Sequence, residues 1–531
     1  MDHYLGIDVG TGSARAGVFD ATGKLLGTGK QDISLFEGAG HRVEQSSAEI
    51  WQAVCIATRA ALKSSGIAAA DIAGIGFDAT CSLVVLGQEG APLPVGDNAG
   101  RDIIVWMDHR ATEQAERINA TGHRVLDYVG GIISPEMETP KLLWLKENKP
   151  EVFDKAWQFF DLTDFLTWKA SGSLARSICT VTCKWTYVQK SGGWDESFFR
   201  SIGLAELADE GFARIGTKIV EAGTALESGL TDTAAADLGL VPGTPVGAGL
   251  IDAHAGGLGT VGAAGASPSD RLAYVFGTSS CTMTSTQDPV FVPGVWGPYY
   301  SAMVPGLWLN EGGQSAAGAA IAKLLQHHPA HGVASEKARA MALSLPDWLG
   351  EQATRNAGSM EAILDKAAGL HVVPEFLGNR APFADPNTRA VIAGLGMETD
   401  INSLVALYIA GICGIGYGLR QIIEAQAERG ITIKSIIISG GAGRSDLVRQ
   451  ILADAAGVSL EAPETDEPVL LGAAVLGALA ADEGVRATNI MERMTRVHRE
   501  YRPSGGSVAN THEKRFVAFK SLQEIARKLA E

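Results

Sequence analysis

The chain has 531 residues, and its 44 basic and 60 acidic residues give a formal net charge of −16. This length exceeds what one hydrophobic core usually organises, so we expect two large domains or more and exclude a lone binding module. The acidic balance repels nucleic-acid backbones and anionic membranes, and neither is expected as a partner. An anionic ligand must therefore be held by local groups such as backbone amides, a metal ion or a few cations.

Six scattered cysteines indicate reduced thiols in a cytoplasmic protein. Only Cys179 and Cys183 lie close together in the sequence, and their spacing fits no common zinc motif. The N-terminus has no signal-peptide pattern, and we find no apolar run of the ~20 residues that cross a bilayer. The sequence thus predicts a soluble intracellular protein.

The first predicted element is a β-hairpin, with strands at residues 4–9 and 14–19. Its turn consists of Gly10, Thr11, Gly12 and Ser13. The glycines let the backbone bring N–H groups to an anion, the hydroxyls add donors, and Asp8 before the turn can hold a metal ion through water. A phosphate cradle is therefore predicted, with an ordinary hairpin turn as the alternative. Arg15 stands where a dinucleotide fingerprint requires glycine, which excludes a Rossmann site.

Strand and helix patterns alternate after the hairpin. Residues 47–64 have helical periodicity and are introduced by Ser46 and Glu49 at capping-box spacing, and residues 72–77 have the pattern of a buried strand. Because this alternation continues along the chain, the sequence predicts an α/β fold with sheets covered by helices.

Three polar clusters and one lysine suggest a site for a polyol. Sugars need many hydrogen-bond partners and an apolar or aromatic wall, which Trp106 or Trp185 can supply. The candidate side chains are Asp78, Thr80, Asp108, His109, Lys184 and Glu311. Polar loops are the alternative for the clusters, and a surface position is the alternative for Lys184.

Asp252 follows a predicted strand and is surrounded by small and apolar residues. A buried carboxylate with few partners has a raised pKa and suits general-base work on a hydroxyl nucleophile. A helix N-cap is the alternative role for Asp252. His254 is expected to be a packed histidine whose hydrogen bonds are satisfied.

A second turn, similar in sequence to the turn at residue 10, lies near the middle of the chain. Gly277-Thr278-Ser279-Ser280 follows a predicted strand at 272–276 and comes 267 residues after the first turn. Val275 stands where the first turn has Asp8, so this turn predicts phosphate contact without a metal. The repeat suggests a duplicated half-chain unit, with domains at 1–255 and 256–531 and a nucleotide cleft between them.

The last predicted elements lie in the second half. Residues 403–428 predict one long helix whose small residues permit close packing. Residues 435–439 predict a buried strand, followed by a glycine turn at 440–443 and a helix at 446–456. Strand, glycine turn and helix in this order are typical of nucleotide-binding segments.

With these elements in place, the chain resembles the FGGY family of carbohydrate kinases, within the actin-like ATPase superfamily, over nearly its whole length. The resemblance rests on an ordered set of motifs rather than on any one of them. They are "YLGIDVGTGSARAGVFD", "GFDATCSLV", "VWMDHRA", "GLIDAHAG", "FGTSSC", "NEGGQSA", "PEFLGNRAPFADPNTRAVIAGL" and "IIISGGAGRSDLVRQILAD".

The resemblance implies two ribonuclease-H-like domains that close on a cleft, with ATP phosphates between the two turns and the sugar deeper. It implies ATP and Mg²⁺, Asp252 as the catalytic base and Asp8 near the metal. The residues that it implies for the nucleotide are Gly10, Thr11, Gly12, Ser13, Arg15, Gly277, Thr278, Gly440, Gly441 and Arg444.

Within the family, the chain is most similar to the ribulokinases, and the string TCSLV at Thr80–Val84 is similar to D-ribulokinases. The implied reaction converts D-ribulose to D-ribulose 5-phosphate, with L-ribulose or a pentitol such as ribitol as alternatives. Lys184, Asp252 and Glu311 align with positions that contact the sugar in L-ribulokinases. A non-catalytic actin-fold sugar sensor or chaperone-like ATPase is the alternative from another class. Sugar and ATP are the expected partners, and a homodimer is the assembly that we consider.

Two positions depart from the family pattern. Asn379 replaces the glutamate of the usual Gly-Glu-Arg, and Ser439 stands where many relatives carry aspartate. Neither change removes a catalytic group, so we expect effects on loop pairing and nucleotide affinity only.

Overall fold

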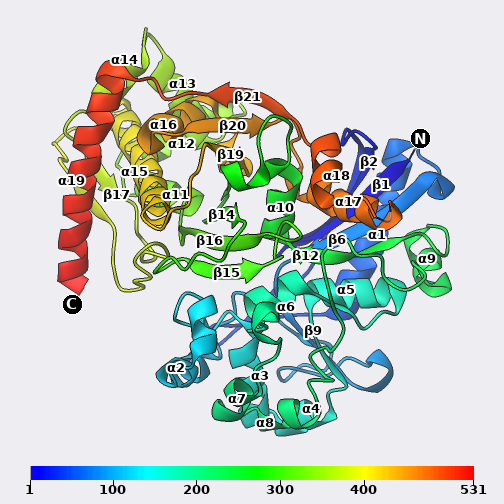
Figure 1. Cartoon of the computed structure of the whole chain (residues 1–531). Coiled ribbons are helices and arrows are strands. Elements are labelled where there is room, and N and C mark those ends of the chain that lie inside the picture. The colour runs from blue at the N-terminus through cyan, green and yellow to red at the C-terminus, as the bar shows by residue number, and fades with distance from the viewer. Residues whose placement is uncertain (1, 483, 531) are drawn as a thin grey trace.

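The computed structural model describes residues 2–482 and 484–530 and has the predicted α/β architecture (Figure 1). Its first large sheet has five strands in the order β12-β6-β1-β2-β3. Their bounds are β1 (His3–Val9), β2 (Ser13–Asp20), β3 (Leu25–Asp32), β6 (Ile72–Ala79) and β12 (Val246–Ile251). Strands β1 to β3 are antiparallel neighbours, whereas β6 runs parallel to β1 and β12 parallel to β6.

The second large sheet repeats this order. Its strands are β13 (Arg271–Phe276), β14 (Ser280–Thr286), β15 (Trp296–Tyr300), β16 (Trp308–Gln314), β19 (Ser435–Ser439), β20 (Ser459–Pro463) and β21 (Val497–Tyr501), in the order β15-β16-β14-β13-β19-β20-β21. Strands β13, β14 and β16 are again antiparallel neighbours, and β19 and β20 again add on in parallel. The shared topology supports the duplication that the two similar turns suggested.

Smaller sheets complete the strand inventory. Strands β4 (Phe36–Gly38), β5 (Arg42–Gln45), β7 (Leu83–Leu86), β8 (Ile103–Ile104) and β9 (Gln158–Asp161) form one antiparallel sheet. The two-stranded sheets are β10 (Arg176–Ser177) with β11 (Ile219–Val220), and β17 (His371–Val373) with β18 (Val391–Ala393).

Helices cover the faces of these sheets. Those of the first half are α1 (Ser47–Ser65), α2 (Thr112–Ala120), α3 (Glu138–Asn148), α4 (Pro150–Lys155), α5 (Leu162–Ser171), α6 (Ile178–Lys184), α7 (Glu196–Ser201), α8 (Ala205–Asp209), α9 (Asp232–Leu238) and α10 (Asp252–Val261). Those of the second half are α11 (Gly318–Gln326), α12 (His331–Ala340), α13 (Leu345–Thr354), α14 (Met360–Asp365), α15 (Ile401–Ala427), α16 (Asp446–Ala456), α17 (Pro468–Ala481), α18 (Ala487–Met494) and α19 (Gly506–Ala530).

Helix α17 packs on the first sheet although its sequence lies in the second half (Figure 1, orange beside the blue strands). Gly6, Gly76 and Gly247 stand in register across β1, β6 and β12 and form what we call the glycine row. A Cβ atom at any of the three would overlap a backbone carbonyl oxygen of α17. The absence of side chains therefore lets this helix lie directly against the strand backbones.

Helix α15 confirms the predicted long helix. Among the described residues, it is the one helix that is long and apolar enough to cross a membrane. However, 78% of its most apolar stretch is buried inside the protein, as in the core helix of a globular domain. A Cβ at Gly414 would overlap the carbonyl oxygen of Val372, so the small residues of α15 do permit close packing.

The predicted capping box at α1 is wrong. Ser46 is the N-cap residue, but its side chain makes no capping hydrogen bond. Glu49 instead accepts hydrogen bonds from the backbone N–H and the hydroxyl of Ser34. The N–H of Ser47 donates to the buried Asp102 carboxylate at 2.8 Å, so a residue from a distant loop satisfies the helix end.

Candidate active site

Three aspartates meet at the carboxyl ends of neighbouring parallel strands. Asp8 and Asp78 are paired in register near the ends of β1 and β6, and Asp252 follows the last residue of β12. Parallel strands that end at one edge of a sheet bring their following residues together, and ligands bind there in open α/β sheets. The structure therefore gathers three carboxylates, far apart in sequence, at one end of the first sheet.

The aspartates have different electrostatic environments. Burial, together with the charges of Asp8 and Asp252, raises the pKa of Asp78 well above its usual value. Burial and the charge of Asp8 raise the pKa of Asp252 to about 6. Asp8 forms an ion pair with Arg15, which also contacts Glu467 at 2.7 Å. One carboxylate of the group is thus compensated by a cation, whereas Asp252 keeps a pKa suited to exchanging a proton near neutrality.

Asp252 is the first residue of α10, and not its N-cap. Ile251 occupies the N-cap position, and the Asp252 carboxylate accepts a hydrogen bond of 2.7 Å from the backbone N–H of Ala253. The carboxylate lies on the wall of a cavity of about 250 Å³. The general-base geometry is therefore available to it.

This cavity lies between the two halves of the molecule. From the first half, its wall includes Thr11, Thr80, Cys81, Trp106, Glu136, Lys184 and Asp252. From the second half, it includes Gly277, Thr278, Ser279, Cys281, Trp296, Glu311 and Arg380. One cavity thus brings together Asp252, Thr11 of the first turn, the second turn, and the predicted sugar residues Thr80, Lys184 and Glu311, whereas Asp8 and Asp78 lie outside its wall.

Lys184 and Glu311 form the charged part of this wall. Burial disfavours the charge of Lys184, but Cys81 and Glu311 hold its pKa well above the usual value. Burial disfavours the charge of Glu311 as well, but Lys184 and His254 lower its pKa to about 2. The Lys184 ammonium lies 5.2 Å from the ring centroid of Trp296 and makes no hydrogen bond with a described residue. It can therefore bind an additional oxygen acceptor.

His254 continues this network behind the cavity. Its Nε2 lies 3.3 Å from Glu311 Oε2, and its Nδ1 lies 3.0 Å from Cys179 Sγ. Cys179 and Glu311 raise the pKa of His254 to about 10, against the effect of burial. His254 is a packed histidine with partners on both nitrogens, as the sequence predicted.

The two glycine turns present unpaired backbone donors. The N–H groups of Thr11, Gly12, Thr278 and Ser279 donate no hydrogen bond within the described part of the chain. The loop of Gly440 and Gly441 follows β19, which pairs with β13 so that Ser439 stands beside Val275. The second turn and this third loop therefore leave the sheet at the same edge, an arrangement suited to an extended phosphate ligand.

Some predicted residues do not line the cavity. Asp108 is fully buried, and its carboxylate binds Arg110 and the backbone N–H of Val43. His109 lies outside the wall but contacts the wall residue Glu136 at 3.3 Å. Trp185 is buried away from the wall, which has Trp106 and Trp296 as its aromatic residues. Gly440, Gly441 and Arg444 lie outside it as well.

Four wall residues were not predicted. These polar and aromatic residues, Glu136, Cys281, Trp296 and Arg380, come from four separate segments. Cys281 and Arg380 lie within quoted family motifs, which is the signal that could have identified them.

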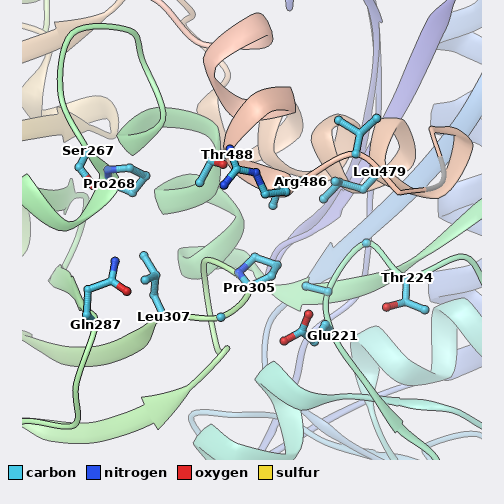
Figure 2. A pocket seen from close by; sticks show the side chains of 15 residues that line it. Glu221, Thr224, Ser267, Pro268, Gln287, Pro305, Leu307, Leu479, Arg486 and Thr488 are labelled. Atoms are coloured by element: carbon cyan, nitrogen blue, oxygen red, sulfur yellow. The ribbon is translucent and has the colours of Figure 1, made fainter.

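A second cavity, of about 480 Å³, lies elsewhere between the two halves (Figure 2). Glu221, Pro305 and Arg486 are among the residues around it. None of the predicted site residues lines it, and the Glu221 carboxylate already accepts a hydrogen bond of 2.8 Å from Ser301. We therefore assign the active site to the smaller cavity, where the base and the glycine turns meet.

Comparison with known proteins identifies the class. The model of the "FGGY family of carbohydrate kinases, N-terminal domain" matches residues 3–259, and that of the C-terminal domain matches residues 272–481. A human FGGY carbohydrate kinase domain-containing protein is 45% identical over 93% of this chain and 91% of its own length. The D-ribulokinase of Saccharomyces cerevisiae is 39% identical over 90% of this chain and 72% of its own length. The crystal structure of xylulose kinase from Rhodospirillum rubrum has a TM-score of 0.82, 19% identity and 99% coverage of both chains.

These matches and the geometry of the cavity define an ATP-dependent sugar kinase with two actin-like domains. The chain belongs to the FGGY family of carbohydrate kinases, and ribulokinases are among its relatives.

Proposed function

We propose that this kinase phosphorylates the terminal hydroxyl of D-ribulose and yields D-ribulose 5-phosphate in the cytoplasm. The yeast D-ribulokinase supports this substrate, and so does the position of Thr80 and Cys81, from the TCSLV string, on the cavity wall. All six cysteines are free, which suits a reducing compartment.

Asp252 acts as the general base. It accepts the proton of the terminal hydroxyl while that oxygen attacks the γ-phosphorus of ATP in line with the departing oxygen of ADP. One P–O bond forms, one breaks, and the proton leaves Asp252 for solvent after the product dissociates. With a pKa of about 6, most Asp252 carboxylates are ionised at neutral pH and ready to accept the proton.

The other wall residues hold the substrates. Lys184 donates to a sugar oxygen and Glu311 accepts from a sugar hydroxyl, while Trp106 and Trp296 cover the carbon chain. The free N–H groups of the two glycine turns bind the phosphates, and the loop of Gly440, Gly441 and Arg444 binds the adenosine.

A magnesium ion fits the carboxylate edge. The pKa of Asp78 is raised by burial and then by the charges of Asp8 and Asp252. Three neighbouring carboxylates concentrate negative charge that a hard divalent cation relieves. Asp8 and Asp78 would hold Mg²⁺, directly or through water. When bound, it neutralises charge on the transferring phosphoryl group.

The observation that carries the proposal is the meeting of Asp252, Lys184 and Glu311 with both glycine turns in one cavity. The test is a coupled ADP-release assay with Mg-ATP and a panel of D-ribulose, L-ribulose, D- and L-xylulose, ribitol, L-arabinitol and glycerol. We expect the highest kcat/KM with D-ribulose. A higher kcat/KM with L-ribulose or a pentitol would change the proposed substrate but leave the proposed phosphoryl transfer unchanged.

The same assay without sugar distinguishes a kinase from a chaperone-like ATPase or a sugar sensor. The kinase releases ADP slowly without an acceptor, because the base has only water to activate, and D-ribulose accelerates it. An ATP turnover that no sugar on the panel changes would reject the kinase assignment.

A further inference from the structure

Two cysteines and a histidine converge directly behind the acceptor cavity. Cys179 and Cys183 stand one turn apart on α6, so their side chains lie on the same face of this helix. Helix α10 places His254 opposite them, with Nδ1 3.0 Å from Cys179 Sγ. One donor atom of each of the three residues lies within 4.8 Å of the other two, and all three residues are buried.

The orientation of His254 is that of a metal ligand. Its Nε2 is held by the Glu311 carboxylate at 3.3 Å, which leaves Nδ1 directed at the cysteines. A carboxylate on the far nitrogen of a ligating histidine is the usual arrangement in zinc proteins, where it fixes the ring and increases its basicity. Two thiolates and one imidazole form a donor set that selects thiophilic cations over Mg²⁺.

Tyr299 supplies a second, independent observation. Its hydroxyl is buried and has no hydrogen-bond partner in the described part of the chain. Burial and then the charges of Cys183 and Glu311 raise the pKa of this hydroxyl, so both groups lie in its surroundings. A buried hydroxyl without a partner is costly. A cation with three protein ligands keeps a fourth position for water, and that water can pair with Tyr299.

We propose that Cys179, Cys183 and His254 bind one thiophilic divalent cation such as Zn²⁺, and that its binding inhibits the kinase. The three ligands are coupled to the reaction site: His254 is two residues from Asp252, Cys183 adjoins Lys184, and Glu311 contacts His254. Coordination fixes His254 and, through the His254–Glu311 contact, holds Glu311, so that its carboxylate cannot turn to accept from a sugar hydroxyl. The inhibitory part rests on the proposed function, whereas the binding site does not.

Binding is tested by titrating the reduced, metal-free, full-length protein with Cd²⁺ and recording the ultraviolet thiolate-to-metal charge-transfer band. We expect a band that saturates at one equivalent. Cys179→Ser and Cys183→Ser each remove most of it, whereas Cys413→Ser, at a buried cysteine of α15, keeps it. Thermal unfolding without metal checks that each variant is folded.

No stoichiometric band in the wild-type protein overturns the site. A band that survives in both Cys179→Ser and Cys183→Ser also overturns it and assigns the metal to other thiols, such as Cys81 and Cys281 on the cavity wall. X-ray absorption of the Zn²⁺-loaded wild-type protein needs no variant: sulfur scatterers in the first shell are expected, and a shell of oxygen and nitrogen alone overturns the site.

Inhibition is measured separately. The turnover after addition of one equivalent of Zn²⁺ is compared with the turnover of the same protein without metal. We expect at least a tenfold loss in the wild type and in Cys413→Ser, restored by a chelator, and a much smaller loss in Cys183→Ser. Binding without loss of turnover overturns the inhibitory part alone. If no sugar is phosphorylated even without metal, the proposed function fails and the Cd²⁺ band still decides the site.

Discussion

At the scale of single residues, the reactivity of Asp252 comes from its neighbours. Asp8 and Asp78 stand at the same strand edge, and of the three aspartates only Asp8 forms an ion pair within the described residues, with Arg15. Burial and the Asp8 charge therefore disfavour the ionised form of Asp252 and raise its pKa to about 6. The fold places a carboxylate where its charge is unfavourable, which costs stability and, in the proposed mechanism, gives a base of useful strength.

We predict that Asp252→Asn lowers turnover by roughly 10² or more, because the hydroxyl loses its proton acceptor. ATP binding, followed by titration calorimetry, should stay within about twofold. The variant should also unfold at a higher temperature, since it removes a buried charge that costs on the order of 1 kcal/mol. Wild-type turnover in a folded variant would remove Asp252 from the mechanism.

The pH profile follows from the same shift. Asp252 is active when deprotonated, so kcat/KM should rise with pH through about 6 and then level off. The ionised Asp252 carboxylate destabilises the folded protein. This destabilisation is fully present above pH about 6 and is lost as the pH falls below that value, so the contribution of Asp252 to stability improves where its activity falls. The control is the pH dependence of the residual activity of Asp252→Asn. If the titration of ATP caused the rise of kcat/KM with pH, the same rise would persist in this variant.

Asn379 explains why this chain can dispense with the family's glutamate. Its side-chain amide donates to Glu375 Oε1 at 2.6 Å, and its carbonyl oxygen accepts from the N–H of Phe383 at 3.0 Å. We predict that Asn379→Glu, which sets two carboxylates against each other, destabilises the protein by about 1–3 kcal/mol and raises the sugar KM through Arg380. Asn379→Gln keeps the donor and should do less in thermal melts and kinetics. Equal effects of the two would dismiss charge as the cause.

Sequence patterns predicted much of the site at this scale, since strand ends and glycine turns are local features. Asp252 and residues of both turns line the cavity, whereas Asp8 lies near the end of β1 outside its wall, and the roles of all of them stay predictions. The spacing of Cys179 and Cys183 fits no common zinc motif, so their sequence does not predict a metal site. The structure adds His254, which lies 71 residues beyond Cys183 in the sequence. Arg380 and Trp296 were missed because only the packing of the two halves brings them to the cavity.

At the scale of elements, the backbone of α17 lies directly against the strand backbones of the first sheet, without side chains between them. The helix is apolar on all sides, and it lies on the glycine row on one side and on α10 on the other. No local pattern indicates this contact, because isolated glycines in strands indicate a close approach but not its partner. The hairpins and α16 were predictable, since their turn and cap residues are adjacent in sequence.

We predict that Gly76→Ala destabilises the protein by about 1–3 kcal/mol or more, because its Cβ overlaps the carbonyl oxygen of Ala473. Gly332→Ala is the matched control: it lies in α12 with no atom within 4 Å of the added carbon. That change should be neutral or stabilise by up to ~1 kcal/mol. Chemical denaturation measures both. Similar stabilities for the two variants would show that α17 can move away from the row.

At the scale of the whole molecule, two sheets of one topology were joined so that each half depends on the other. The sequence predicted the duplication from four residues in each turn, and the strand order bears it out. The boundary near residue 255 stays a prediction, but the packing crosses it, because α17 lies against strands of the first half (Figure 1). Sequence order gives no information on such a return of the chain.

This dependence predicts that a fragment of residues 1–262 does not fold alone. Without α17, the glycine row and its apolar surroundings are exposed to water, and we expect insoluble material. Coexpression of a segment spanning residues 464–497, which carries α17 and α18, should increase the soluble yield. A monodisperse, folded fragment in the absence of that segment would contradict the prediction.

The position of α17 also has a consequence for biosynthesis. Strand β12 ends at residue 251 and α17 ends at residue 481, so the first sheet is translated well before the helix that covers it. At a ribosomal speed of roughly 5 to 20 residues per second, the uncovered sheet waits roughly 10 to 50 s. During that interval the nascent chain carries a bare strip of strand backbone and apolar side chains. The growing polypeptide is therefore a client for chaperones that bind at the ribosome, and slow codons between the two elements would prolong its exposure.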